Sequence, residues 1–319
     1  MALLIITGIT GVALRALTSR YDDTVTKERL LDPFARKEQK DGRISGPLNY
    51  LLIGSDQRPR NPDAGERADT IMIAHVPEGL DRAYLISVPR DLLVQIPPHP
   101  PSGYEGGEDK INSAFQFGRG GQGGTQLVSA TLTRMTGIRF DGAAIINFGG
   151  FRKVIDLVGG VEVCLDREVR SIHTGNVYPA GCQEMNGAEA LDFARQRYGL
   201  PEGDFDRQRH QQQLLRALLD RISNTKLLAD PLKADQILRE VGSALTLDTN
   251  GVPTEDLVVG LRDLRPDALS GIRLPSHSET INANSYTLLD GAAVDLFRAV
   301  RDADVESWAK ANPRWVNDL

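Results

Sequence analysis

The sequence predicts an α/β fold in which a mixed central β-sheet is covered by helices on both faces. Short β-rich runs alternate with helical segments along the chain, and the β-rich runs are apolar enough to be buried. Turns rich in Gly, Pro and Asp separate many of these elements. With 319 residues, the chain is long enough to bury a sizeable core.

Four apolar runs predict the first strands of the sheet. LNYLLIGSD (48–56) predicts a strand with a loop at its end. TIMIAHV (70–76) and RAYLISV (82–88) predict two more strands, and the intervening PEGLD is typical of a hairpin turn. A loop rich in Pro and Gly is predicted for 97–110, and GAAIINF (142–148) predicts a further buried strand.

Helices are predicted between and after these strands. KINSAFQFG opens one, and the glycine loop GGQGG leads into a second that stops near Gly137. FRKVIDLVGG predicts a short helix before the strand VEVCL, and Asn186 with Glu189 predicts a capped helix start. The tail from 231 predicts two more helical segments and the strand GIRLP. The helix in DFDRQRHQQQLLRALLDRI presents one apolar stripe, formed by Leu214, Leu215, Leu218, Leu219 and Ile222.

The N-terminus bears on the compartment. Residues 2–14 are uncharged and mostly apolar, a run too short for the roughly 20 residues of a membrane span. Two interpretations remain: residues 1–20 are the remnant of a signal or signal anchor, or they form a buried amphipathic helix. Residues 21–46 are polar and charged, which predicts a stalk.

After this stalk we expect one folded domain over residues 47–300, whose chemistry-bearing part lies at about 48–222, and a C-terminal tail over 301–319.

The charge balance excludes one class of partner and suggests another. A net charge of −6 provides no basic field for nucleic acid, so we expect no nucleic-acid binding. Arginines greatly outnumber lysines among the 37 basic residues. This excess indicates either a GC-rich genome or planar guanidinium groups that bind phosphate or carboxylate.

Three carboxylates, Asp56, Asp69 and Asp91, lie at or beside predicted strand ends. Sites in such sheets gather at strand ends, and converging carboxylates repel one another unless a cation lies among them. Mg²⁺ suits such a set, with Mn²⁺ as the alternative, and it takes one or two carboxylates together with substrate phosphates. The other interpretation is three separate turn aspartates.

The candidate cations are predicted to lie near these carboxylates. Arg207 and Gln211 are four residues apart and share one face of a helix, and their row continues into the apolar stripe. We therefore expect both to point inward, where a buried cation needs an anionic partner. The alternative is a salt-bridge network spread over a surface. The full candidate set is Arg67, Arg90, Arg195, Arg197, Arg207 and Gln211.

Other common chemistries lack their signatures. No Ser-His-Asp, Cys-His or zinc-ligand spacing stands out, there is no Walker-type loop, and GGQGG matches no dinucleotide fingerprint. Cys164 and Cys182 could be two buried thiols or could close a short loop, and two cysteines alone do not decide between these.

Several motifs in order resemble the LytR-CpsA-Psr family of bacterial cell-wall ligases. These are NYLLIGSDQR, ERADTIMIAHV, AYLISVPRDLLVQIP, KINSAFQFG, INFGGFRKVIDLVGGVEVCL and MNGAEALDFARQRYGLPEGDFDRQRHQQQLLRALL. Together they run from about residue 48 to about residue 220, and the part from 231 to about 300 is similar to the family less distinctively.

The resemblance implies a catalytic α-β-α sandwich and a Mg²⁺-dependent phosphotransferase. The implied donor is a glycopolymer on a polyprenyl pyrophosphate, and the implied acceptor is a peptidoglycan hydroxyl, usually the 6-hydroxyl of N-acetylmuramic acid. A phosphodiester forms and lipid phosphate leaves. Two other activities stay open: a hydrolase that cleaves the same pyrophosphate with water, and a non-catalytic lipid-binding or regulatory protein.

The resemblance also assigns roles to residues of this sequence. Asp56 and Asp69 match the metal-binding carboxylates, and Asp91 would be a further metal ligand, an orienter of Arg90 or a base. Arg67 and Arg90 are expected, with Asp91, to be catalytic. The expected pyrophosphate clamp consists of Arg67, Arg90, Arg195, Arg197, Arg207 and Gln211.

The implied location is outside the bacterial plasma membrane, on a single-pass signal anchor. An extracytoplasmic domain favours a disulfide between Cys164 and Cys182. The carrier lipid would need an apolar channel, for which the Leu214–Ile222 helix and the sheet face are the expected lining.

Overall fold

The fold is that of a computed structural model, which describes most of the chain from residue 26 onward. Residues 1–20, the predicted anchor remnant, lie outside the described residues, as does part of the predicted stalk. Among the described residues, no helix has the length and apolar character needed to span a membrane. The described residues are 26–38, 44, 46–56, 67–224, 239–240, 242, 244–317 and 319.

An eight-stranded mixed sheet forms the centre of the molecule. Its strand order is β1-β12-β7-β2-β3-β4-β13-β16. The β2–β7 and β4–β13 pairs are parallel, whereas β2, β3 and β4 form an antiparallel meander that contains the predicted hairpin. In that order, the strands span Thr26–Lys27, Leu245–Asp248, Gly142–Asn147, Leu48–Ser55, Ala68–Val76, Ala83–Val88, Leu269–Arg273 and Val316–Asn317.

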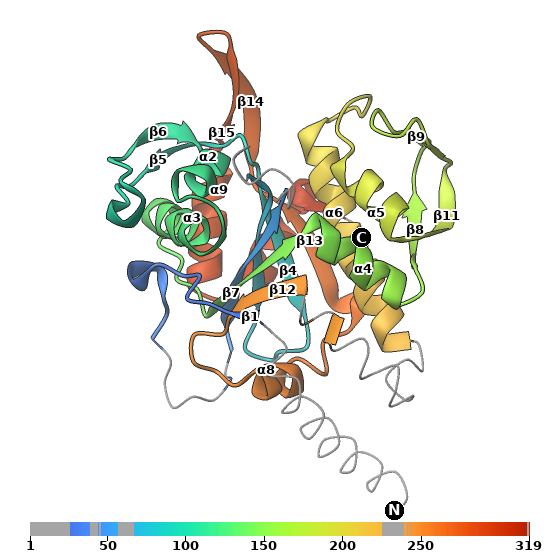
Figure 1. The fold of residues 1–319 in the computed structure, drawn as a ribbon, viewed down its shortest axis with the longest axis horizontal. Coiled ribbons are helices and arrows are strands. Elements are labelled where there is room, and N and C mark those ends of the chain that lie inside the picture. Colours follow the sequence, from blue (N-terminus) through green and yellow to red (C-terminus); the bar gives the residue numbers. More distant parts are fainter. Residues whose placement is uncertain are drawn as a thin grey trace, which may run out of the picture.

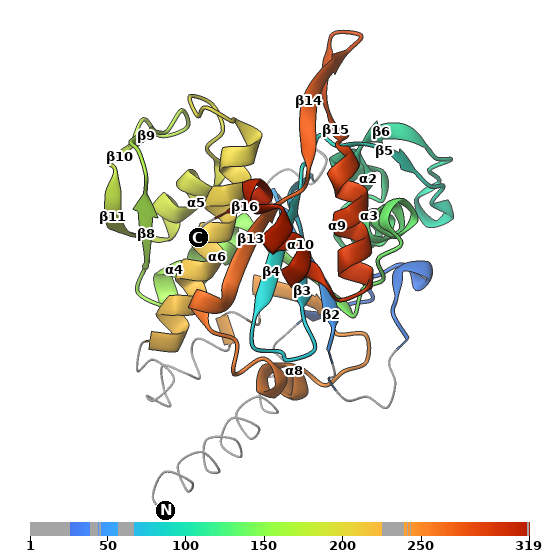
Figure 2. The same ribbon diagram turned by 180° about the vertical axis from the view of Figure 1, so that it is seen from behind.

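Helices cover both faces of this sheet, which confirms the predicted fold class (Figures 1 and 2). One face carries α2 (Ile111–Phe117), α3 (Gly121–Thr136), α9 (Gly291–Arg301) and α10 (Val305–Ala311). The other face carries α4 (Phe148–Leu157), α5 (Gly187–Arg195) and α6 (Asp204–Asn224). The short helix α8 (Thr254–Gly260) lies at one end of the sheet.

Local sequence signals begin and end the helices as predicted. Gly137 ends α3 with a φ of 71°, and its N–H donates to the carbonyl of Thr133. Asn186 and Glu189 form a capping box at the start of α5. Asn147, which was not predicted as a cap, begins α4 by accepting from the N–H of Gly150.

Strand alternation decides which side chains face which helical layer. The first layer packs on a continuous core that includes Leu51, Ile53, Ile71, Ile73, Ile86, Ala143, Ile145 and Ile272, together with Phe115, Leu127 and Trp308 of the helices. The intervening residues, Leu52, Gly54, Thr70, Met72, Ala144 and Ile146, face the second layer. Most of the strong β-formers therefore lie on the first face.

Smaller hairpins are attached to this framework. β8 (Val161–Leu165) pairs with β11 (Gly181–Met185), and the disulfide Cys164–Cys182 crosses this pair, which confirms the expected bond. The remaining hairpins are β5 (Leu93–Ile96) with β6 (Gly107–Lys110), β9 (Val169–Arg170) with β10 (Val177–Tyr178), and β14 (Ser276–Ile281) with β15 (Asn284–Leu289). These three hairpins were not predicted, because their strands are short or polar. The loop predicted for 97–110 was wrong at 107–110, which form β6.

The fold extends beyond both predicted domain boundaries, residues 47 and 300. In the predicted stalk, Leu30 and Leu31 are fully buried and β1 joins the sheet edge. In the predicted tail, β16 pairs with β13, and Trp308 and Trp315 are buried in the first core. Both segments alternate charged residues with a few large apolar ones, and these apolar side chains decide their burial.

Candidate active site

A cavity of about 480 Å³ separates the second face of the sheet from α4, α5 and α6. The sheet contributes large apolar residues such as Leu52 and Met72, together with Gly54, Thr70 and Ala144, whose small side chains leave room for the space. The helices contribute further apolar groups, so the walls are mainly hydrocarbon. Those groups are Phe148, Phe151, Val154, Leu191, Leu214, Leu215, Leu218 and Ile222. The predicted apolar lining from α6 and the sheet face is therefore present.

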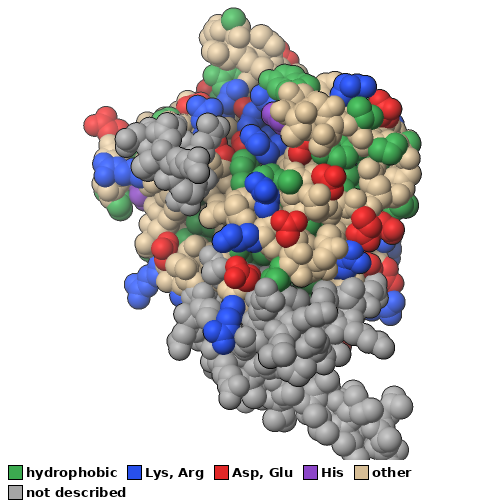
Figure 3. Space-filling model, turned by 45° about the vertical axis from the view of Figure 1, so that its right-hand side comes forward, with side chains coloured by type: hydrophobic (Ala, Val, Ile, Leu, Met, Phe, Trp, Pro, Cys, Tyr) green, Lys and Arg blue, Asp and Glu red, His purple; other side chains and the backbone are tan. Residues whose placement is uncertain are grey.

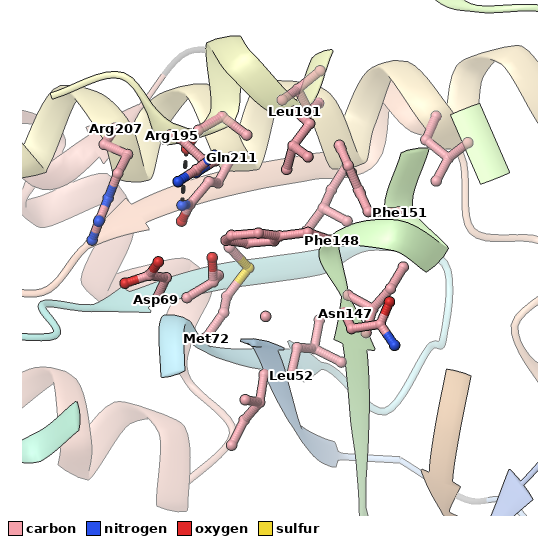
Figure 4. A pocket seen from close by; sticks show the side chains of 18 of the residues that line it. Leu52, Asp69, Met72, Asn147, Phe148, Phe151, Leu191, Arg195, Arg207 and Gln211 are labelled. Carbon is pink, nitrogen blue, oxygen red and sulfur yellow. Dashed lines mark hydrogen bonds between the residues drawn. The ribbon is translucent and has the colours of Figure 1, made fainter. Parts of the chain in front are cut away.

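The two ends of the cavity differ in character (Figure 4). Arg207, Gln211 and Asp69 gather at one end, whereas Phe151 and Leu191 lie toward the other. Arg90, Arg195 and Arg197 also line the space, so cations predominate among its charged side chains. A site of this form suits a ligand with an anionic head and a hydrocarbon body.

A chain of ion pairs organises the polar end. Arg90 Nη1 lies 2.6 Å from Asp69 Oδ1, which joins the end of β4 to the start of β3. Arg90 Nε lies 3.9 Å from Asp204 Oδ1, and Arg207 Nη2 lies 2.8 Å from the same oxygen. Asp204, the first residue of α6, therefore lies between two cations that come from the sheet and the helix.

Arg207 is buried, Arg90 is half-buried, and both are incompletely paired. The side chain of Arg207 is only 5% exposed. Burial lowers its pKa, with Arg90 and Arg197 adding to the effect and Asp204 and Asp69 opposing it. Burial also lowers the pKa of Arg90, but Asp69, Asp91 and Asp204 outweigh it and raise the value. Within the described residues, both Nε atoms are buried without a hydrogen-bond partner, which leaves donors for an anion.

The other predicted cations surround this pair. Arg195 lies over the ring of Phe148, with the guanidinium carbon 5.0 Å from the ring centroid. Arg197 stacks on Tyr198 at 4.5 Å and donates to its hydroxyl at 2.6 Å. Such stacking holds a guanidinium group in place while its edge remains available to phosphate. The face drawn in Figure 3 carries Lys and Arg side chains down its middle, with hydrophobic side chains among them.

Two neighbouring glutamines position α6. Gln211 Nε2 donates to the carbonyl of Ala194 at 3.2 Å, which ties α6 to the end of α5. Gln212 is fully buried on the adjacent side. Its Nε2 lies 2.8 Å from the carbonyl of Leu85, 2.9 Å from Ser87 Oγ and 3.2 Å from the carbonyl of Ile272. These contacts attach α6 to the sheet beside the cavity without filling the cavity.

Three predicted site residues do not line the cavity. Asp56 Oδ1 accepts from the N–H of Arg67 at 2.7 Å, and the Arg67 side chain is exposed. Asp91 Oδ1 lies 3.0 Å from Lys110 Nζ, and its other oxygen lies 3.6 Å from Arg90 Nε. Across the described residues, no three His, Cys, Asp or Glu side chains gather as a metal-binding group. The expected convergence of Asp56, Asp69 and Asp91 is therefore absent from this structure.

Six of the predicted residues share the cavity, and two residues of the charged network were missed. The six are Asp69, Arg90, Arg195, Arg197, Arg207 and Gln211. Asp204 is three residues before Arg207 on the same helix face, a spacing that could have indicated their ion pair. Lys110 is distant in sequence from Asp91 and had no local signal.

Comparisons with known proteins agree with this picture. The model of the LytR_cpsA_psr family matches residues 15–300, which confirms the predicted resemblance. The probable cell wall biosynthesis protein LcpB of Corynebacterium glutamicum is 34% identical over 211 residues, covering 62% of this chain and 48% of LcpB. The chain thus spans about half the length of this relative.

A second relative is matched over more of its length. It is the polyisoprenyl-teichoic acid–peptidoglycan teichoic acid transferase TagU of Oceanobacillus iheyensis, 28% identical over 250 residues, with 78% of this chain and 73% of TagU covered. Crystal structures share the fold: B. subtilis TagT has a TM-score of 0.63 at 21% identity, over 88% of this chain and 100% of TagT. TagT bound to LIIa-WTA gives a TM-score of 0.64.

Proposed function

Because the chain belongs to the LytR-CpsA-Psr family, we propose that it transfers a glycopolymer from a polyprenyl-pyrophosphate carrier to peptidoglycan. The acceptor in this proposal is a peptidoglycan hydroxyl, for which the 6-hydroxyl of N-acetylmuramic acid is our first choice, and the product is a phosphodiester. The name of TagU, a polyisoprenyl-teichoic acid–peptidoglycan teichoic acid transferase, supports this substrate class.

One observation carries the proposal: the arginine-rich end and the hydrocarbon walls belong to one cavity. A soluble phosphorylated sugar would use the arginines but would gain nothing from an apolar space of about 480 Å³. A lipid without phosphate would leave the buried Nε donors of Arg90 and Arg207 without a hydrogen-bond partner, at a cost. A polyprenyl pyrophosphate matches both parts.

The side chains at the polar end would act by holding charge. In the proposed reaction, the acceptor oxygen forms a bond to the sugar-linked phosphorus, and the bond from that phosphorus to the lipid phosphate breaks. The lipid leaves as a monophosphate, and the hydroxyl proton passes to solvent. Arg90 and Arg207 would bind the non-bridging oxygens with their free N–H groups. Such positioning and charge neutralisation supply most of the catalysis in phosphoryl transfer.

Asp91 is the residue whose expected role was open. Its carboxylate lies between Lys110 and Arg90 and outside the cavity lining, an arrangement that favours the orientation of Arg90 over direct contact with substrate. We therefore assign Asp91 to positioning.

Asp56 and Asp69 are the residues that would hold Mg²⁺ or Mn²⁺. Asp56 directly follows β2, and Asp69 is the second residue of the paired strand β3. Two carboxylates with phosphate oxygens suit Mg²⁺ chemically. When bound, the ion would neutralise charge on the pyrophosphate oxygens. Asp69 would then share its carboxylate between the ion and Arg90.

We propose an extracytoplasmic position at the bacterial plasma membrane, on a single-pass anchor. The disulfide Cys164–Cys182 supports an oxidising compartment, since such bonds are rare in reducing ones. A polyprenyl donor would also reside in that membrane.

A turnover assay tests the proposed function. Purified protein would receive a labelled polyprenyl-pyrophosphate-linked saccharide, with Mg²⁺ or EDTA and with or without peptidoglycan. We expect Mg²⁺-dependent movement of label to peptidoglycan, and its loss in Arg90→Ala. Arg298→Ala is the matched control, because Arg298 also pairs with an aspartate but lies on α9 at the first face. Donor loss without transfer would instead indicate a hydrolase, and retention of donor without turnover would indicate a carrier.

A further inference from the structure

The hairpin β14–β15 forms an arm that projects from the body of the molecule (Figures 1 and 2). Its strands pair over six positions and are joined by Asn282 and Ala283, which have φ values of 50° and 64°. This is a tight two-residue connection. A two-stranded ribbon is marginally stable by itself, so the base of the arm matters for its position.

That base is attached directly to the charged end of the candidate active site. The N–H of Thr287 donates to the carbonyl of Asp91 at 2.9 Å, and Thr287 pairs with Leu92 as an isolated parallel bridge. The side chains continue the connection. Lys110 Nζ lies 3.0 Å from Asp91 and 5.4 Å from the ring centroid of Tyr286. An unbroken row of contacts therefore runs from Arg90 through Asp91 and Lys110 to Tyr286.

One face of the arm continues this row. Tyr286 is paired with Glu279 across the hairpin, and partners in an antiparallel pair share a face. By strand alternation, Asn284 and His277 lie on the same face, whereas Thr280 and Ser285 lie on the opposite one. Glu279 and Asn284 are exposed, and Tyr286 is half-buried.

The chemistry of the arm selects among ligands. Its sequence SHSETINANSYTLL has no Lys or Arg, which disfavours an anionic partner such as nucleic acid or a phospholipid headgroup. Leu288 and Leu289 lie at its base, and Ile281 beside the turn is the one large apolar residue at its tip, which therefore offers little to a membrane. Hydroxyl, amide and carboxylate groups beside an aromatic ring suit a neutral polyol, because the ring contacts sugar C–H faces and the polar groups bind hydroxyls.

We propose that the face of the arm formed by Glu279, Asn284 and Tyr286 binds the acceptor glycan and presents its hydroxyl to the phosphate held by Arg90. The inference rests on the proposed transferase function and adds the acceptor site to it. Because the donor occupies the cavity, the acceptor bound on the arm would reach the same reacting phosphorus from a different side. Glu279 and Tyr286 are binding residues in this account, not catalytic ones.

Acceptor kinetics and direct binding would test the arm. The probe is soluble, uncrosslinked glycan strands prepared from peptidoglycan, with the labelled polyprenyl-pyrophosphate saccharide as donor. For Tyr286→Ala and for Glu279→Ala we expect the KM for glycan to rise about tenfold, the scale of one aromatic or hydrogen-bonding contact. Thr280→Ala, on the opposite face of the same arm, should leave this KM unchanged.

A calorimetric titration of the glycan strands without donor separates this inference from the proposed function. Binding that is weakened by Tyr286→Ala, in a protein without transferase activity, would support the arm and refute the proposed reaction. Transfer by the wild-type chain with an unchanged KM in both variants would refute the arm alone. Tyr286→Phe retains the ring and should retain most of the affinity, so a loss in Tyr286→Ala that appears equally in Tyr286→Phe would also contradict the stacking role.

Discussion

Both faces of the central sheet carry apolar residues, but one is packed against helices in a continuous core and the other borders a cavity. On the first face, Ile53, Ile73 and Ile86 meet α2, α3 and α9 in a continuous core. On the second face, the alternate positions of the same strands meet α4, α5 and α6 across a cavity of about 480 Å³. Burial of hydrocarbon alone does not explain the difference.

Two features of the second face keep the space open. Its strands present three small residues, Gly54, Thr70 and Ala144, among larger ones such as Leu52 and Met72. Polar groups then fix α6 at a set distance, since Gln212 binds the sheet backbone and Asp204 of α6 lies 3.9 Å from Arg90 Nε. The first face therefore supplies stability, and the second gives up packing to retain a binding space.

The largest effect should come from the charged end of the second face. Arg207→Ala should lower transfer by on the order of 10²–10³-fold, because it removes a preorganised guanidinium group from the developing phosphate charge. Folding should persist, since the first core is untouched. Transfer rates and thermal unfolding of the same preparations would check this. If Arg207→Ala transferred the polymer at the wild-type rate, Arg207 would not bind the reacting phosphate.

Truncations on the two faces should differ in stability. Phe115→Ala on the first face should cost about 3–5 kcal/mol of unfolding free energy, because Phe115 is fully buried in a close-packed core. Leu218→Ala on the second face should cost less than about 1 kcal/mol, because Leu218 already borders open space. Denaturant titrations of both variants would measure the contrast. Equal costs would mean that both faces are packed alike.

The disulfide should support only the second layer. Replacing Cys164 and Cys182 by Ser should lower stability by about 2–4 kcal/mol, the usual contribution of such a bond. Amide hydrogen exchange should accelerate in α4, α5 and the β8–β11 hairpin, which form one cluster beside the bond. Exchange in α3 and α9 should stay slow. Uniform acceleration across both layers would contradict the separation of the two faces.

The smallest effect concerns pH. Burial, with a contribution from Arg209, lowers the pKa of His210 on α6 to about 3 from an ordinary 6.5. The unfolded chain therefore binds more protons than the folded one between these values, so this contribution to stability is present above pH 6.5 and is lost as pH falls. At pH 5 the loss should be on the order of 2 kcal/mol.

His210→Phe tests this sign. The variant retains the ring stacked on Phe193, whose centroid lies 4.0 Å away, but cannot be protonated. Its unfolding free energy should fall less than that of the wild type between pH 7 and pH 5. His75, on the central sheet, also has a lowered pKa of about 4 and supplies a residual slope in both proteins. Identical slopes would refute the assignment to His210.

Many of the strands and helices could be predicted from the sequence, because local sequence signals determine them. Alternation in LNYLLIGS and TIMIAHV predicted two central strands, and the Asn186–Glu189 pair predicted the start of α5. The spacing of Arg207, Gln211 and Leu214 also predicted the inward face of α6, where the structure places them at the cavity.

Other features depend on contacts that no local pattern encodes. The pairing of Asp91 with Lys110, and of both with the β14–β15 arm, joins segments far apart in the chain. The cavity depends on which strand positions carry small residues after the register is set. Leu30 and Trp315 were assigned to polar termini because their neighbours are charged, yet their own apolar area decided their burial.

Photocrosslinking would test most directly whether the second face receives the donor's hydrocarbon chain. A polyprenyl diphosphate with a photoreactive group in its chain would be irradiated with the protein, and the modified peptides would be mapped by mass spectrometry. We expect crosslinks to residues 204–224 of α6 and 148–157 of α4, competed by unlabelled lipid. Competed crosslinks confined to α3 or α9, or none on α4 and α6, would contradict this expectation.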